Sequence, residues 1–365
     1  MTYEVLSCDI PMQGAVSRIL ARGEVTLPAL SPGETGKARF SLPASFAEGD
    51  VLKLEAFDRD GHRICDWSFP IRLANPHLAQ VSTGLSGNTV SARNNGKEIV
   101  LKSEKVSVTF DAATGMILRV LSGNTEIPLT NGPVAVGMKM LCQPAISYVR
   151  QDSAVFCARY KGGADSIVWR LTSQGLLYMD AVLLNRASGG GGFDDAFMDT
   201  EVYNLGLTFS YPERICKGMK WLGRGPYRVW KNRIPGTNYG IWHKDYNNTV
   251  TGESYDNLVY PEFKGYHANM YWATFESDTA PFTVYSRTDG IFYRVFTPEE
   301  PKGSAKRTMP EFPEGDISFL LDIPAICSFK PIEQQGPNSQ PGNIRIKKGD
   351  EGLRLNLMFD FRKEN

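Results

Sequence analysis

Short runs of alternating apolar and polar residues recur along the chain, and turn-forming residues separate them. The run Lys53-Leu54-Glu55-Ala56-Phe57 alternates residue by residue, as a half-buried strand requires, because successive side chains of a strand point to opposite faces. Stretches such as Arg59-Asp60-Gly61 interrupt these runs with turn residues. The sequence shows no convincing long run with the 3.6-residue period of an amphipathic helix. This pattern predicts an all-β protein.

The spacing of these runs divides the chain into a small domain, a linker and a large domain. Residues 1–75 are predicted to form a small β-sandwich, residues 76–86 a linker without sustained periodicity, and residues 87–365 a large β-domain. In the small domain we expect strands at residues 3–8, 23–27, 37–42, 51–57 and 65–71. Trp67 and Trp169 lie in the middle of predicted strands, so both are expected to be buried.

Composition excludes several classes of function. Lys plus Arg and Asp plus Glu both number 40, so the formal net charge is zero, and neither nucleic acid nor an anionic membrane is predicted as a partner. The chain shows no signal-peptide pattern and no apolar run of membrane-spanning length, and the compartment stays open. The 6 Cys and 4 His lack the spacings of a zinc site, so no metal and no cofactor are predicted.

Residues 221–233, which read W-L-G-R-G-P-Y-R-V-W-K-N-R, combine aromatic rings and cationic groups around two glycines and a proline. Glycine permits backbone angles closed to other residues, and proline fixes its own φ, so a strand at residues 218–222 is predicted to end in a rigid turn. Aromatic faces and planar donors together are suited to sugars. The alternative is a tight corner of a β-domain whose Trp side chains belong to the core.

This segment resembles the G-x-G-P-x-E-x-Y-x-D-R signature in the C-terminal domain of family 2 glycoside hydrolases of the β-galactosidase type. Residues 260–267, Y-P-E-F-K-G-Y-H, are similar to the P-Q-E-x-G segment that follows the signature in that family. Three positions depart from the signature: Arg228 stands in place of Glu, Trp230 in place of Tyr and Asn232 in place of Asp. Upstream, G-E-V-x-L-P-x-L-x-P-G followed by Trp67 resembles the immunoglobulin-like domain next to the last domain.

The resemblance implies a small immunoglobulin-like sandwich, whose first strand in the family we do not identify here, followed by a large galactose-mutarotase-like β-supersandwich. In this family the catalytic carboxylates lie in a (β/α)-barrel that precedes these two domains. The chain would then be the non-catalytic C-terminal portion of a β-galactosidase-like glycoside hydrolase, which scaffolds and lines part of a carbohydrate-binding cleft. We expect it to be inactive alone. Its partners would be a β-glycoside or oligosaccharide and a catalytic barrel in the parent chain or in a partner chain.

Two alternatives stay open. In the first alternative, the chain is an independent carbohydrate-binding small subunit. In the second it is an aldose-mutarotase-like isomerase, whose proton transfer would use His243 and His267 with Glu262.

The candidate site combines residues from separate aromatic-rich segments, one of which, residues 238–251, is predicted to be a loop. Because a core holds few unpaired charges, these residues are expected to cluster on one face of the large domain. The candidate carbohydrate-binding residues are Arg224, Trp230, Arg233, Trp242, Tyr260, Glu262 and His267. In the family a further aromatic side chain comes from a stretch whose counterpart here is residues 315–322, where Phe319 is the aromatic residue.

Overall fold

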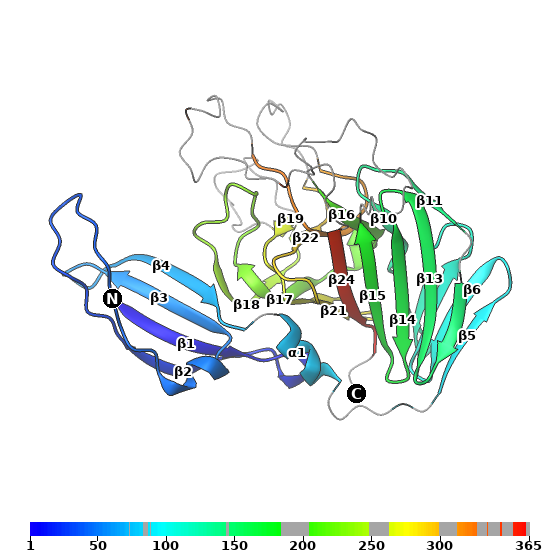
Figure 1. The fold of residues 1–365 in the computed structure, drawn as a ribbon, viewed down its shortest axis with the longest axis horizontal. Coiled ribbons are helices and arrows are strands. Elements are labelled where there is room, and N and C mark those ends of the chain that lie inside the picture. The colour runs from blue at the N-terminus through cyan, green and yellow to red at the C-terminus, as the bar shows by residue number, and fades with distance from the viewer. Residues whose placement is uncertain are drawn as a thin grey trace.

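The computed structural model describes residues 1–72, 74–82, 87, 89–143, 146–183, 204–247, 263–298, 312–326, 334, 344 and 353–362, with the backbone alone for residues 74–77. Antiparallel strands make up most of this part of the chain, so the predicted all-β class is confirmed (Figure 1). Its one α-helix, α1 (Ala74–Val81), begins at the end of the predicted small domain and overlaps the predicted linker, residues 76–86. No helix in these residues is long and apolar enough to span a bilayer.

The N-terminal residues form a four-stranded antiparallel sheet, called the small sheet, with the order β2-β1-β3-β4. Its strands are β1 (Thr2–Cys8), β2 (Ser17–Glu24), β3 (Val51–Phe57) and β4 (Arg63–Pro70). Short 3-10 turns at Pro11–Gln13 and Ala44–Glu48 lie in its connections. The small sheet projects from one side of the large domain (Figure 1).

A loop, rather than a second sheet, lies over part of the small sheet. The predicted strand at residues 37–42 is wrong, because residues 25–43 contain no strand. Pro28, Pro32 and Pro43 punctuate this stretch, and proline cannot donate a hydrogen bond to a ladder. The loop still packs on the sheet, where the rings of Phe40 and Tyr3 stack 5.4 Å apart.

Trp67 is not buried as predicted, since 43% of its surface is exposed. The neighbouring β4 side chains point to the opposite face and contact the large domain. There Asn238 Nδ2 donates to Asp66 Oδ2 at 2.7 Å, and the Tyr239 N–H donates to Ser68 Oγ at 2.6 Å. Because β4 presents this polar face to the large domain, Trp67 points away, to the side that the loop covers only in part.

The large domain is built on one ten-stranded antiparallel sheet. The path β11-β13-β14-β15-β24-β21-β20-β17-β18 runs across it, and β12 pairs with β13 beside β11. Its strands are β11 (Met140–Cys142), β12 (Ile146–Arg150), β13 (Ser153–Gly162), β14 (Ser166–Thr172), β15 (Leu176–Leu183), β17 (Gly218–Gly225), β18 (Asn238–Asp245), β20 (Trp272–Glu276), β21 (Phe282–Ser286) and β24 (Leu353–Asp360). The predicted loop at residues 238–251 is therefore wrong where β18 lies.

Two five-stranded sheets face the inner side of the ten-stranded sheet. The first, in the order β5-β6-β7-β8-β9, comprises β5 (Val90–Asn94), β6 (Glu98–Ser103), β7 (Val106–Asp111), β8 (Ile117–Ser122) and β9 (Thr125–Ile127). The second, in the order β10-β16-β23-β22-β19, comprises β10 (Thr130–Ala135), β16 (Gly206–Ser210), β19 (Gly265–His267), β22 (Phe292–Val295) and β23 (Ile317–Leu320). A 3-10 turn, Glu213–Ile215, follows β16.

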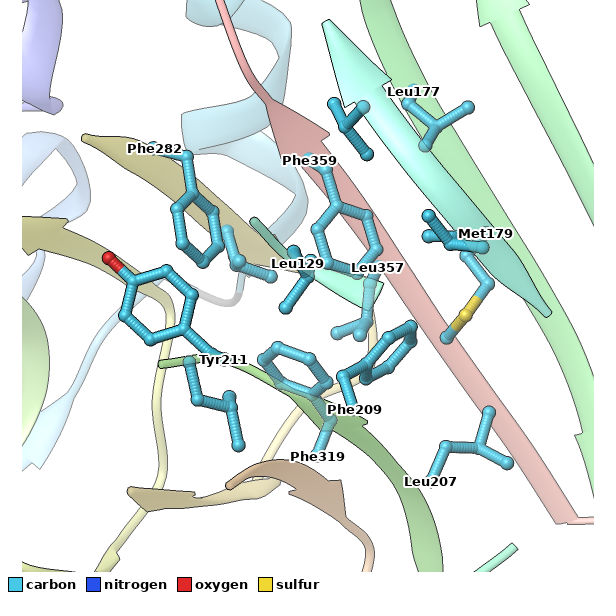
Figure 2. Close-up of a cluster of buried hydrophobic side chains, with 14 of the residues drawn as sticks. Leu129, Leu177, Met179, Leu207, Phe209, Tyr211, Phe282, Phe319, Leu357 and Phe359 are labelled. Carbon is cyan, nitrogen blue, oxygen red and sulfur yellow. The ribbon is translucent and has the colours of Figure 1, made fainter. Parts of the chain in front are cut away.

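The main core lies between these layers (Figure 2). Phe209 and Phe319 from the second five-stranded sheet meet Phe359 of β24 with ring centroids 5.7–6.0 Å apart. Phe110 of β7 lies 5.3 Å from the Trp169 ring of β14. Trp169 is fully buried, which confirms its predicted position. Sheets facing across interdigitated apolar side chains form a sandwich.

A second apolar cluster joins the small sheet to the outer side of the ten-stranded sheet. Cys8 and Ile10 pack there with Trp272, Tyr285 and Met358, together with Val81 of α1 and other residues. Next to this cluster the buried carboxylate of Asp50 accepts a hydrogen bond from the Cys8 N–H at 2.6 Å and pairs with Arg72 at 2.5 Å. An interface with its own buried core restricts the movement of one part against the other.

Candidate functional site

The glycines of the signature segment are required by close packing. A Cβ at Gly225 would lie 2.5 Å from Trp242 Cδ1, so the indole of Trp242 lies directly over this glycine. A Cβ at Gly223 would lie 2.9 Å from Met270 Sδ. Neither glycine has a positive φ, so the expected need for unusual backbone angles is wrong. Trp242 Nε1 donates to the carbonyls of Gly223 and Asn238 at 3.3 and 3.1 Å, which holds the half-buried indole in place.

Arg224, between these two glycines, has a fixed guanidinium. Its Nε donates to Asn269 Oδ1 at 3.0 Å, and its Nη1 donates to the Thr237 carbonyl at 2.9 Å. Its Cζ lies 4.5 Å from the centre of the Tyr239 ring, within cation–π range. The backbone of Arg224 is also bound, since its N–H donates to Ala268 O and its carbonyl accepts from Trp221 Nε1. The guanidinium is thus oriented before any ligand arrives.

Two tyrosines and an asparagine complete what we call the Arg224 cluster: Arg224, Tyr239, Asn269 and Tyr271. The rings of Tyr239 and Tyr271 lie 6.1 Å apart. Burial raises the pKa of the Tyr239 hydroxyl against the opposing effect of Arg224, and burial likewise raises the pKa of Tyr271, so both are neutral donors. Asn269 has a φ of 51°, a left-handed backbone that is uncommon for a residue other than glycine and often marks functional positions.

The Arg224 cluster lies where the small sheet meets the large domain. Tyr239 is the second residue of β18, and its N–H donates to Ser68 Oγ of β4 in the small sheet. The sequence prediction missed Tyr239, Asn269 and Tyr271 as site residues. The sequence contains only weak signals for these three residues. Tyr239 belongs to a stretch that was predicted to be a loop, and Asn269 and Tyr271 come just before an apolar strand whose residues are typical of a core.

Trp230 and the residues after it form a pinned corner. Trp230 is only 8% exposed and packs against the stacked rings of Tyr266 and Phe312, with centroids 5.5 and 5.4 Å away. Asn232 exchanges two hydrogen bonds with the backbone of Ile326, at 3.0 and 3.1 Å. Beside it, Lys231 pairs with the fully buried Asp322 at 2.8 Å. These contacts fit the alternative in which this half of the signature maintains a corner.

Of the seven predicted residues, the five that the structure describes do not form one surface. Arg224 and Trp242 lie on neighbouring strands, but their side chains point to opposite faces of the sheet. Arg233 is exposed and donates from Nη1 to the Asn232 carbonyl at 2.8 Å. Tyr260 and Glu262 lie outside the described residues.

His267 is fully buried, not part of a surface. Its Nε2 is 3.1 Å from the Phe263 carbonyl, and its ring meets Trp221 edge-on at 5.2 Å. Its Nδ1 has no hydrogen-bond partner among the described residues. Burial lowers the pKa of His267 to about 4, and nearby Arg228 and Lys244 act in the same direction, so the imidazole is neutral near pH 7.

The two histidines proposed for an isomerase do not converge, and Glu262 lies outside the described residues. His243 is half exposed and lies 2.9 Å from Glu276, whereas His267 is buried behind Trp221. His243 follows Trp242 in β18, so its side chain points away from the main core that contains Trp221. Phe319, expected near a sugar, is also buried in the main core. These placements do not favour a catalytic role for the two histidines or a sugar contact for Phe319.

One exposed group has the donor atoms of a metal site. Asp58, Asp60 and His62, in the turn between β3 and β4, bring one ligand atom each within 4.8 Å of the others. The Asp58 carboxylate already accepts hydrogen bonds from the backbone N–H groups of Asp60 and His62, and these bonds, that from His62 first, lower its pKa. Such hydrogen bonds are those of an ordinary turn stabilised by aspartate.

Comparison with known proteins adds no family. No protein-family model matches the chain, and a search of curated proteins finds no match.

Proposed function

We propose that the chain is a non-catalytic, carbohydrate-binding part of a β-galactosidase-like glycoside hydrolase, and that the Arg224 cluster contacts the sugar. The observation that carries this proposal is the guanidinium of Arg224, held by Asn269 and Thr237 beside two tyrosine rings. A group fixed in this way loses little conformational entropy when it binds a ligand.

The chemistry of the Arg224 cluster suits a neutral sugar. A guanidinium carries five N–H donors, more than the hydrogen bonds of Arg224 to Asn269, Thr237 and Tyr239 use, and the planar group can donate to adjacent oxygens such as neighbouring hydroxyls. Tyr271 is half-buried, and its ring offers an apolar face for sugar C–H groups together with a hydroxyl. Asp289 lies close enough to raise the pKa of both tyrosines, so a carboxylate also lies near the Arg224 cluster.

The proposal that the chain alone is not catalytic follows from the resemblance. A retaining glycosidase needs two carboxylates about 5 Å apart, and in the family both come from a barrel that precedes these domains. The described residues contain no barrel of alternating strands and helices. We therefore expect no hydrolysis of nitrophenyl β-glycosides by the chain alone, and turnover that follows the purified protein would contradict this.

The test of the binding role is a fluorescence titration with galactose and neutral β-galacto-oligosaccharides. We expect saturable binding in the millimolar range, about −4 kcal/mol, because a large part of the site would come from the barrel. Arg224→Lys keeps the charge but loses the planar donors, so it should weaken binding. Arg93→Lys, an exposed position in β5, is the matched control and should leave binding unchanged. Equal affinity of all three proteins would refute the Arg224 cluster as the site.

A further inference from the structure

The outer side of the ten-stranded sheet is divided into two halves. Over β17, β20 and β21 it is covered through the apolar cluster that contains Leu222, Trp272 and Tyr285. The apolar cluster extends onto β15 and β24 through Leu176 and Met358, and beyond them cationic side chains are exposed on β12, β13 and β24. Strands β13, β14, β15 and β24 lie side by side in this half of the sheet (Figure 1). We call this second half the basic face, defined by Tyr148, Arg150, Arg159, Lys161, Arg170 and Arg354.

The strand register places these residues on one surface. Ala158 and Tyr160 of β13 point into the main core. Because side chains alternate along a strand, Arg159 and Lys161 point to the outer side. Arg159 is level with Arg354, because Arg159 pairs with Ser166, Ser166 with Val182, and Val182 with Arg354. Three strand spacings separate the two arginines, about 14 Å.

The second row of the basic face lies farther along the same strands. Tyr148 pairs with Val155, and Val155 pairs with Arg170, so the three side chains share the outer side. Tyr148 is 44% exposed, and Arg150, Arg159, Lys161 and Arg354 are exposed as well. Four residues along a strand separate this row from that of Arg159, about 13 Å. The basic face is therefore an extended surface and not one point of charge.

Acidic groups compensate only part of this charge. The carboxylate of Asp180 forms an ion pair with Arg287. The guanidinium groups of Arg170 and Arg287 lie 4.1 and 5.1 Å from the centre of the Tyr178 ring. Asp152 and Asp165 lie in the turns at either end of β13, at the rim. Among the described residues, no ion pair engages Arg150, Arg159, Lys161 or Arg354.

We propose that the basic face binds an anionic polysaccharide, one that carries sulfate esters or uronate carboxylates. Several guanidinium groups around an exposed tyrosine offer charge-assisted hydrogen bonds to such oxygens and one ring for stacking. The choice of a glycan rests on the proposed function. A nucleic acid carries similar anionic oxygens, so single-stranded DNA is included among the probes that test the choice of a glycan.

The experiment compares a sulfated galactan, a polygalacturonate and a neutral galactan by isothermal titration with the full 365-residue chain. The test variant is Arg159→Ala with Arg354→Ala, and the control variant is Arg93→Ala with Arg119→Ala, which removes equal charge from exposed positions of β5 and β8. We expect the Kd for an anionic polysaccharide to rise about tenfold in the test variant, since each exposed charge contributes a few-fold. The control variant should bind as the unaltered chain does, and binding should weaken with salt.

The two anionic probes separate a sulfate site from a carboxylate site, and binding of either one supports the proposal. Equal losses in the test and control variants, no binding of either anionic probe, or equally tight binding of single-stranded DNA would each overturn it. Neutral galacto-oligosaccharides test the Arg224 cluster separately. If they bind and the anionic probes do not, only the basic face fails; if the reverse holds, only the Arg224 cluster fails.

Discussion

The indole of Trp242 lies over Gly225, so closely that a Cβ at position 225 would be 2.5 Å from Trp242 Cδ1. The two residues belong to adjacent strands, β17 and β18, and the indole N–H is bound by the carbonyl of Gly223. This contact holds the end of β17 against β18 at the point from which Arg224 projects. The glycines of the signature segment therefore position the Arg224 cluster without touching a ligand.

Gly225→Ala is expected to destabilise the fold. The new methyl group overlaps the indole ring, and overpacking of this kind costs about 1–3 kcal/mol. Gly240→Ala is the matched control, because a Cβ there would lie 3.6 Å from the same indole, an ordinary contact. The measurement is the free energy of unfolding in urea, in which Gly240→Ala should differ from the unaltered chain by less than about 1 kcal/mol. Similar losses in both variants would contradict the packing described.

The two mid-strand tryptophans are expected to behave differently. Trp169 is fully buried beside Phe110, so Trp169→Ala should cost about 3–5 kcal/mol. Trp67 is 43% exposed, so Trp67→Ala should cost about 1 kcal/mol or less. Chemical denaturation of both variants checks the difference. A loss at Trp67 as large as at Trp169 would mean that the outer side of the small sheet is covered in solution.

His267 is expected to make stability depend on pH in the acid range. Its pKa is about 4 in the folded chain, below the ordinary value of 6.5, because burial disfavours the charged imidazolium. Between these two values the unfolded chain binds more protons, so stability is highest above pH 6.5 and falls as the pH drops toward 4. The shift corresponds to about 3 kcal/mol for this one group.

The measurement is the free energy of unfolding from pH 7 to pH 4, compared between the unaltered chain and His267→Gln. Carboxylates contribute equally to both proteins, so their difference isolates the imidazole. We expect the variant to lose less stability on acidification. Parallel curves, or an NMR titration of His267 with a pKa near 6.5, would refute the buried neutral state.

Strand positions were predictable where burial alternates strictly. The strands β7 and β14 follow from such runs, because one face of each contacts the main core. Helix α1 was missed, since Ala74–Val81 is stabilised by the burial of Val81 against distant strands and not by a strong local pattern. The residues at 37–42 alternate as a strand would, yet the prolines around them leave this stretch as a loop.

The candidate site was predictable only in part. Arg224 could be named because an arginine between two glycines is conspicuous in the sequence, but its partners Asn269 and Tyr271 lie more than forty residues away along the chain. Their proximity depends on the pairing of β17 with β20. Trp230 and His267 have the residue types of a sugar site, and only tertiary packing decides that they are buried.

The basic face was not predicted, because its residues come from separate strands. The whole-chain charge of zero concealed a local excess of cations on one sheet face. This local excess can be recognised only from the strand register, which aligns Arg159 with Arg354.

Binding of a neutral sugar at the Arg224 cluster is tested most directly by NMR mapping of backbone amide shifts during titration with a β-galacto-oligosaccharide. We expect the largest concentration-dependent shifts at Arg224, Tyr239, Asn269 and Tyr271, with saturation in the millimolar range, about −4 kcal/mol. Arg224→Lys should reduce these shifts at equal ligand concentration. No shift at these four residues at saturating sugar, or the largest shifts on another face of the large domain, would contradict the account.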